Sequence, residues 1–162
     1  MNGDGFSAIL FEKPAYPRET ELYKKILIPV DLSEPAMSEK GEAAAVELAK
    51  IGDAEIRLVT VQFPTPLTFM DYVPDDFEAQ LRENSESALK ELAAGLDYPK
   101  EKVSTAIRLG SVYAEVLAEA EAWGADLIVI GSHRPSMSTY LLGSNAKTIV
   151  RHAKCSVLVA RD

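Results

Sequence analysis

From about residue 23 onward, runs of apolar residues alternate with stretches in which apolar residues recur at helical spacing. The apolar runs predict five strands, at 24–31, 54–63, 102–110, 126–132 and 155–161. The first run is apolar almost without interruption, which is typical of a strand covered on both faces. Strands that alternate with helices in this way indicate βαβ units around a parallel sheet. The sequence therefore predicts an α/β fold.

Helices are expected between these strands. Ser33 is the expected N-cap of the first helix, which has Pro35 in its first turn and ends near residues 51–52, and Ser111 is the expected N-cap of the third. The last helix is expected from about Ser144 to His152. The apolar positions expected to face the sheet are Met37, Gly41, Ala44, Ala45 and Leu48 in the first helix, Phe77, Leu81, Ala88 and Leu92 in the second, Val112, Val116, Ala120 and Trp123 in the third, and Ala146, Ile149, Val150 and Ala153 in the last.

Composition narrows the class of protein. The chain has 162 residues, 47% of them hydrophobic and 26% charged, which corresponds to about one globular domain. Seventeen Lys and Arg against 25 Asp and Glu leave a net charge of -8, which opposes binding to nucleic acid or to an anionic membrane surface. We therefore expect neither nucleic acid nor membrane among the partners.

Two further features concern metals and location. One cysteine, Cys155, and two histidines provide no recognisable set of ligands for zinc or an iron–sulfur cluster, and Cys155 is expected to be inert. Residues 1–22 are expected to form an irregular leader, with long connections at 64–74 and 132–142. The apolar run Ala8 to Phe11 in the leader is too short for the core of a signal peptide, so we expect a cytoplasmic location.

Candidate chemistry lies where the first and fourth strands end, because ligands of doubly wound sheets bind outside the carboxyl ends of the strands. Asp31 could accept hydrogen bonds from ribose hydroxyls, and Gly131 would let a nucleotide approach the backbone. Gly143, Ser144 and Asn145 open the last helix and could direct free N–H groups at a phosphate chain. The alternative is purely structural: a turn stiffened by Asp31, a strand exit at Gly131 and a Gly-Ser helix cap.

Three segments carry a resemblance to a known family. KKILIPVDLSE in the first strand, YVPDDFEAQL in the middle and ADLIVIGSHRPSMSTYLLGSNAKTIVRHAKCSVLVAR at the end resemble the universal stress protein family, in its F- and G-type bacterial branch. The resemblance covers about 23–162 and leaves the leader outside. It implies a three-layer α/β/α, Rossmann-like fold whose five-stranded parallel sheet has the strand order 3-2-1-4-5.

The resemblance also implies a ligand, ATP, alone or with Mg²⁺. The Gly-x2-Gly-x9-Gly-Ser/Thr motif of ATP-binding members maps onto Gly131, Gly143 and Ser144, but Arg134 replaces the second glycine and the loop is one residue shorter. Arg134 could contact phosphate or lie in solvent. His133 is expected to be a hydrogen-bonding group and not a catalytic one. The implied nucleotide-binding residues are Pro29, Asp31, Val61 through its backbone, Gly131, Ser132, His133, Arg134, Gly143, Ser144 and Asn145.

The implied function is a cytoplasmic, ATP-binding stress-response regulator with an unknown protein partner. It would form a homodimer through the last strand, Ser156 to Arg161. The alternatives are a nucleotide-free dimeric adaptor of the family and a slow ATPase or autophosphorylating enzyme. An ATP pyrophosphatase is disfavoured because Asp31-Leu32-Ser33 stands where its Ser-Gly-Gly loop would be, and a phosphoacceptor receiver domain because its aspartate and lysine are missing after the third and fifth strands.

Overall fold

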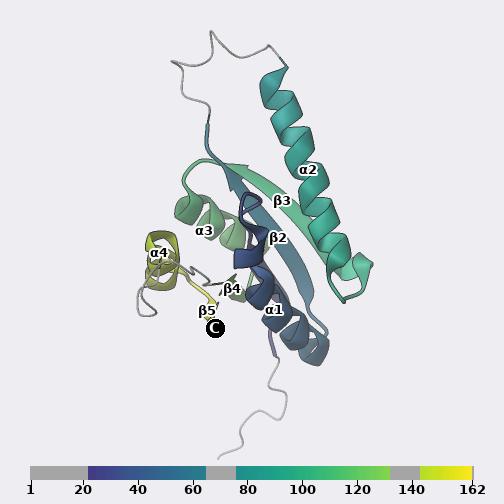
Figure 1. Cartoon of the computed structure of the whole chain (residues 1–162). Helices are drawn as coiled ribbons and strands as arrows, with labels where there is room; N and C mark the ends of the chain where they lie inside the picture. Colours follow the sequence, from purple (N-terminus) through teal and green to yellow (C-terminus); the bar gives the residue numbers. More distant parts are fainter. Residues whose placement is uncertain (1–21, 65–75, 132–142, 162) are drawn as a thin grey trace, which may run out of the picture.

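The computed structural model describes residues 22–64, 76–131 and 143–161. Within them, five strands form one sheet in the order β3-β2-β1-β4-β5, with every neighbouring pair parallel (Figure 1). The predicted fold class and strand order are confirmed. The elements are β1 (Lys25–Pro29), η1 (Pro35–Met37), α1 (Glu39–Gly52), β2 (Glu55–Gln62), α2 (Phe77–Gly95), η3 (Lys100–Lys102), β3 (Val103–Leu109), α3 (Val112–Trp123), β4 (Leu127–Gly131), α4 (Ser144–His152) and β5 (Ser156–Ala160), where η marks a short 3-10 helix.

Helices cover both faces of the sheet, and each face has its own apolar core. Successive residues of a strand point to opposite faces. β1 therefore contributes Ile26 and Ile28 to the core under α1 and α2 and Leu27 to the core under α3 and α4, and all three side chains are fully buried. This two-sided burial is why the first strand of the sequence is apolar without alternation.

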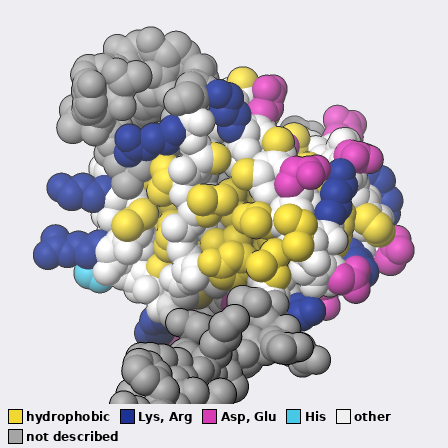
Figure 2. Space-filling model, turned by 90° about the horizontal axis from the view of Figure 1, so that it is seen from below, with side chains coloured by type: hydrophobic (Ala, Val, Ile, Leu, Met, Phe, Trp, Pro, Cys, Tyr) yellow, Lys and Arg dark blue, Asp and Glu magenta, His cyan; other side chains and the backbone are white. Residues whose placement is uncertain are grey.

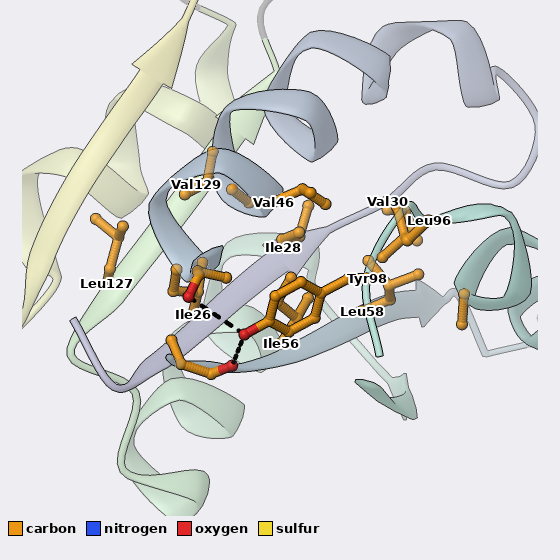
Figure 3. Close-up of a cluster of buried hydrophobic side chains, with 14 of the residues drawn as sticks. Ile26, Ile28, Val30, Val46, Ile56, Leu58, Leu96, Tyr98, Leu127 and Val129 are labelled. Atoms are coloured by element: carbon orange, nitrogen blue, oxygen red, sulfur yellow. Dashed lines mark hydrogen bonds between the residues drawn. The ribbon is translucent and has the colours of Figure 1, made fainter. Parts of the chain in front are cut away.

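Tyr98 closes the core under α1 and α2 at the amino end of the sheet (Figure 3). Its hydroxyl lies 2.7 Å from the carbonyl oxygen of Ala54 and 3.2 Å from that of Ala49, so one proton joins the end of α1 to the start of β2. Burial raises the pKa of the Tyr98 phenol, which keeps that proton in place. The tyrosine hydroxyl thus links α1 and β2 through hydrogen bonds inside an otherwise apolar cluster.

The start of α1 differs from the prediction. Ser33 does not cap the helix: residues 35–37 form η1, and α1 begins at Glu39 with Ser38 in the N-cap position. The Asp31 carboxylate accepts hydrogen bonds from both the N–H and the hydroxyl of Ser33, which engages Ser33 in a turn before the helix. The predicted inner face is confirmed, because its members are buried or half-buried, and α1 ends at Gly52 as expected.

The predicted inner stripe of α2 is only partly correct. Leu92 packs against the core, but Phe77, Leu81 and Ala88 are exposed, and the buried residues are Leu89 and Ala93. The Gln62 side chain, at the end of β2, donates to Ser85 at 2.8 Å. Residues 77–84 therefore lie beyond the end of β2, and Figure 1 shows α2 extending past the sheet. Apolar spacing continues there without a strand beneath it.

The last helix departs in part from the expected burial, and the last strand lies at an edge of the sheet. α4 has the predicted bounds, and Ile149 is buried, but Val150 is 47% exposed and His152 is exposed. Among the described residues β5 pairs only with β4, and it is an edge strand in which Ser156 and Leu158 are exposed. This edge position agrees with the predicted strand order 3-2-1-4-5, which places the last strand at one edge of the sheet.

A network of charged side chains joins α3 to β2 and β3. The carboxylate of Glu119, which is buried, accepts from Arg57 at 2.9 Å and lies 3.7 Å from a guanidinium nitrogen of Arg108. Arg108 also pairs with Glu115 at 3.1 Å, and the Arg57 guanidinium lies 4.5 Å from the centre of the Trp123 ring. Glu115, Glu119 and Trp123 are four residues apart, so one stripe of α3 makes all these contacts.

Candidate functional site

β1 and β4 are neighbours in the sheet, and the described helices that follow them in the chain, α1 and α4, pack on opposite faces. α1 follows β1 over one face, whereas α4, the next described helix after β4, packs on the other face beside α3. In a doubly wound sheet this arrangement opens a crevice at the carboxyl ends of the two strands. The sequence-predicted residues Pro29, Asp31 and Gly131 lie at or just after the ends of β1 and β4, where such a crevice is expected.

Asp31 is exposed and is engaged by its own turn. One carboxylate oxygen, Oδ1, accepts from the Ser33 N–H at 2.9 Å and from the Ser33 hydroxyl at 2.6 Å. The turn-stiffening role considered for Asp31 is therefore real. Within the described residues both bonds use Oδ1, which leaves Oδ2 as the acceptor for a ligand hydroxyl.

Val61 directs its peptide groups toward β1 at the same end of the sheet. The carbonyl of Val59 accepts from Val30 on the β1 side, and that of Gln62 accepts from Gly110 on the β3 side. Because peptide groups alternate along a strand, the N–H and C=O of Val61 point toward β1. The register of β1 with β2 ends at Val59, two residues earlier, while the Val61 side chain packs into the core. Both the core role and the backbone role considered for Val61 are thus compatible.

Gly131 has a packing role that the sequence did not reveal. A Cβ at this position would overlap the carbonyl oxygen of Met37 and lie 3.0 Å from the Cα of Ser38. Conversely, a Cβ on Gly41 would lie 2.9 Å from the Gly131 nitrogen. The two glycines let the start of α1 rest on the end of β4, so the chain itself fills the space that was expected to admit a nucleotide.

Gly143, Ser144 and Asn145 begin α4. Gly143 occupies the N-cap position with a φ of -55°, and a Cβ there would meet no described atom within 4 Å. Ala146, in the first turn, packs against the core that contains Ile130, which brings the start of α4 toward the end of β4. The first N–H groups of a helix have no intrahelical acceptor, so they remain available to an anion. α4 has no acidic residue.

Sequence reasoning missed Ser38 and Glu42, which are both buried at the start of α1, with Ser38 beside Gly131. The Ser38 hydroxyl lies 2.6 Å from Glu42 Oε1 and 2.9 Å from the carbonyl of Pro35. Burial raises the pKa of the Glu42 carboxyl, an effect that the Ser38 hydrogen bond opposes. The four-residue spacing of a serine and a glutamate was visible in the sequence, but nothing there indicated burial.

The remaining predictions have different outcomes. Ser132, His133 and Arg134 lie outside the described residues, as do the leader and the loop that joins β4 to α4. Over the described ranges, no three His, Cys, Asp or Glu side chains gather closely enough to hold a metal ion. Burial raises the pKa of the Cys155 thiol, which agrees with an inert cysteine.

Comparison with known proteins decides the family. The family model described as "Universal stress protein family" matches residues 22–161. The chain belongs to the universal stress protein family. Universal stress protein G of Shigella flexneri is 38% identical over 143 residues, covering 86% of this chain and all of that protein. The family resemblance seen in the sequence is confirmed.

Solved structures of universal stress proteins and similar chains share the fold. The structure of hypothetical protein MJ0577 has a TM-score of 0.70 and 25% identity, covering 87% of this chain and 97% of that one. A universal stress protein in complex with cAMP has a TM-score of 0.56 and 24% identity, covering 86% and 98%. The family match includes every described residue of the candidate site. No helix among the described residues is long and apolar enough to cross a membrane.

Proposed function

We propose that this universal stress protein binds ATP in the crevice between the ends of β1 and β4 and acts as a regulator whose partner binding depends on nucleotide occupancy. The start of α4 carries this proposal. Gly143 has neither a positive φ nor a packing neighbour among the described residues that would require glycine. A phosphate bound to the first N–H groups of the helix would favour glycine at this position, because a residue without a Cβ lets the ligand approach the backbone.

The proposed pose uses one group from each element around the crevice. The adenine edge meets the peptide groups of Val61, a ribose hydroxyl donates to Asp31 Oδ2, and the phosphates accept from the N–H groups of Ser144 and Asn145. Pro29, half-buried at the end of β1, lines the adenosine side. Ser132, His133, Arg134 and a Mg²⁺ ion remain predictions from the family resemblance.

The cAMP complex supports this choice of ligand class in a limited way. It shows that one protein of this fold accommodates an adenine nucleotide. A cyclic monophosphate has one phosphate, whereas a helix start with several free N–H groups suits a longer phosphate chain. We therefore place ATP before cAMP, and the binding experiment includes both.

The test is equilibrium dialysis of the full chain with ATP and with cAMP, comparing Gly143→Trp with Gly95→Trp. Both glycines are open to a Cβ among the described residues, but Gly95 ends α2 on the opposite face of the sheet. The indole at 143 would occupy the phosphate position. We expect Gly143→Trp to weaken ATP binding roughly tenfold or more, which corresponds to at least about 1.4 kcal/mol, and Gly95→Trp to leave it unchanged.

Unchanged ATP binding in Gly143→Trp would show that the assigned cradle is wrong. Absence of ATP and cAMP binding in the unmodified chain would favour the nucleotide-free adaptor. That alternative draws on two observations, because Asp31 and Gly131 already have structural roles in the turn and in the α1 contact. Tighter binding of cAMP than of ATP would contradict the proposed phosphate chain.

A homodimer through β5 forms the second part of the proposal. β5 is an edge strand whose outer backbone groups have no neighbour in the described sheet, and Val157, Leu158 and Val159 are all partly exposed. Figure 2 shows apolar side chains gathered at the centre of the face seen from below. Covering the β5 edge by a second copy would pair its backbone and bury Val157, Leu158 and Val159. A monomer in sedimentation at micromolar concentration, with and without ATP, would contradict it.

A further inference from the structure

The first two turns of α2 are exposed on every side. Residues 76–84 are all exposed, although all but the first are helical. Leu81, Ser85 and Leu92 lie on one side of α2, because their spacings are close to whole helical turns. Ser85 accepts from the Gln62 side chain at 2.8 Å, and Leu92 packs against the core under α1 and α2, so this side faces the sheet. Leu81 is nevertheless 40% exposed, and Figure 1 shows α2 extending past the sheet.

The end of β3 has a matching apolar side chain on the face that α2 covers. Val103 and Ile107 pack against the core under α1 and α2, so Leu109, two residues after Ile107, points to the same face. Leu109 is in register with Gln62, whose side-chain nitrogen lies 3.5 Å from the carbonyl oxygen of Leu81. Leu109 is nevertheless 61% exposed. The leucines of α2 and β3 are therefore held on the same side of the sheet without covering each other.

Two aromatic side chains extend this apolar area. Phe77 precedes Leu81 by one helical turn, Phe63 directly follows β2, and both are exposed. We call Phe63, Phe77, Leu81 and Leu109 together the α2–β3 surface. They are four of the eight large apolar side chains that are exposed among the described residues. Exposed apolar side chains that gather in one area mark interaction sites on soluble proteins.

The charge around the α2–β3 surface is acidic. Residues 76–86 include four acids and one arginine. That arginine, Arg82, pairs with a glutamate of its own helix at 3.2 Å, and Arg108, at the end of β3, pairs with Glu115 at 3.1 Å. Glu78, in the first turn of α2, is exposed and forms no ion pair within the described part of the chain. The surface therefore combines apolar side chains with uncompensated negative charge.

The sign of this charge selects among the partners that an apolar surface can have. Nucleic acids and anionic membranes carry the same sign and are repelled. A second copy of the chain would bring its own four acids against these four. A basic amphipathic helix matches both properties, because its apolar stripe can pack against the leucines while its Lys and Arg side chains lie beside Glu78.

We propose that the α2–β3 surface docks a basic amphipathic helix of a partner protein. Val61, whose peptide groups meet the adenine edge in the proposed pose, lies two residues before Phe63, so a bound nucleotide and a docked helix would be neighbours. In this respect the inference rests on the proposed function, because this helix is the partner whose binding ATP would regulate. Docking itself uses residues outside the proposed nucleotide site and is measured without nucleotide.

The test is binding of a labelled peptide to the full chain, followed by fluorescence anisotropy. The probe is a helical peptide of about 14 residues, with leucines on one face and lysines on the other. We expect Leu81→Ser and Leu109→Ser each to weaken its binding about fivefold or more, as the loss of one apolar anchor would. Ile51→Ser is the matched control, because Ile51 is 74% exposed at the end of α1, and we expect it to leave binding unchanged.

The charge of the surface is tested separately. Glu78→Gln is expected to weaken binding of the basic peptide about two- to fivefold, as the loss of one exposed charge pair would. Glu55→Gln removes the same charge from an exposed position at the start of β2 and is expected to leave binding unchanged. A peptide with glutamates in place of the lysines is expected not to bind.

Three results would overturn the proposal: equal peptide binding by Leu81→Ser and Ile51→Ser, equal binding of the basic and acidic peptides, or dimerisation of the unmodified chain that Leu81→Ser abolishes. In the last case a second copy occupies the surface. Added ATP tests a different point. A peptide affinity that ATP leaves unchanged would contradict the nucleotide-dependent partner binding of the proposed function and leave the docking site intact.

Discussion

Replacing Gly131 with alanine separates the structural role of this glycine from any role in nucleotide binding. The added Cβ would overlap the carbonyl oxygen of Met37 and lie 3.0 Å from the Cα of Ser38. Both neighbours are backbone atoms, which cannot move aside as the end of a flexible side chain can. The start of α1 must therefore shift away from β4.

The cost follows from how firmly α1 is held. Ala45, Val46 and Ala49 are at most 5% exposed and pack in the core, so the helix cannot tilt without opening that contact. Forcing an extra carbon into a packed interior costs about 1–3 kcal/mol. We expect the upper part of this range, about 2–3 kcal/mol, which lowers the Tm by roughly 5–10 °C for a chain of this size.

The assay is urea unfolding without nucleotide, with thermal unfolding as a second measure. Gly143→Ala is the matched control, because its Cβ would meet no described atom, and we expect its free energy of unfolding to stay within about 1 kcal/mol of the unmodified chain. If Gly131→Ala is as stable as Gly143→Ala, the contact between α1 and β4 does not require glycine, and the packing explanation fails.

Three other predictions concern buried carboxylates and chemistry. Glu119→Gln removes the charge that Arg57 and Arg108 share and is expected to cost about 1–3 kcal/mol in urea unfolding, whereas Glu121→Gln, at an exposed pair, is expected to cost less than about 1 kcal/mol. The raised pKa of Glu42 means that its ionised form destabilises the fold, so Glu42→Gln is expected to be more stable than the unmodified chain at pH 7. This advantage is expected to shrink as the pH falls toward and below 4.5, the ordinary pKa of the group, because the carboxyl of the unmodified chain is then neutral. A Glu42→Gln variant that is less stable than the unmodified chain at pH 7 would contradict this prediction. Steady-state ATP hydrolysis is expected to stay below about one turnover per second, because no base contacts the Ser144 hydroxyl in the described part of the site; a faster rate would make His133→Ala the next variant.

The sheet could be predicted because its central strands are buried on both faces, and such strands have continuous apolar sequences. Ile26 and Ile28 pack in the core on one face of the sheet and Leu27 packs in the core on the other. Because both faces of the strand are buried, its sequence is an uninterrupted apolar run, which is not expected of an exposed segment. Apolar spacing on helices is less reliable. It marks which residues share a side, but Leu81 and Val150 are exposed because their surroundings are not covered within the described residues. How far a helix extends past the strands beneath it depends on the tertiary structure, so the apolar spacing of the helix does not reveal it.

The burial of charged side chains could not be predicted from the sequence. Glu42 and Glu119 are both buried, and each is compensated by a partner on the same helix or on a neighbouring strand. In the sequence they look like ordinary charged helix positions, since burial of a charge depends on partners that only the fold brings within reach. Ser33 was misread for the opposite reason, because its local partner, Asp31, engaged the hydroxyl that a helix cap would have used.

The two described motif glycines show how a functional signature and a packing requirement can share a residue type. At Gly131 the missing Cβ is explained by Met37 and Ser38, so this glycine would be needed even in a chain that bound nothing. At Gly143 neither a positive φ nor any described neighbour requires glycine, which is one of several residues that suit an N-cap, and the residue opens a helix whose first N–H groups lack acceptors. Gly143 and the start of α4 therefore support a phosphate site more strongly than Gly131 does, and substitutions there decide whether this chain binds a nucleotide.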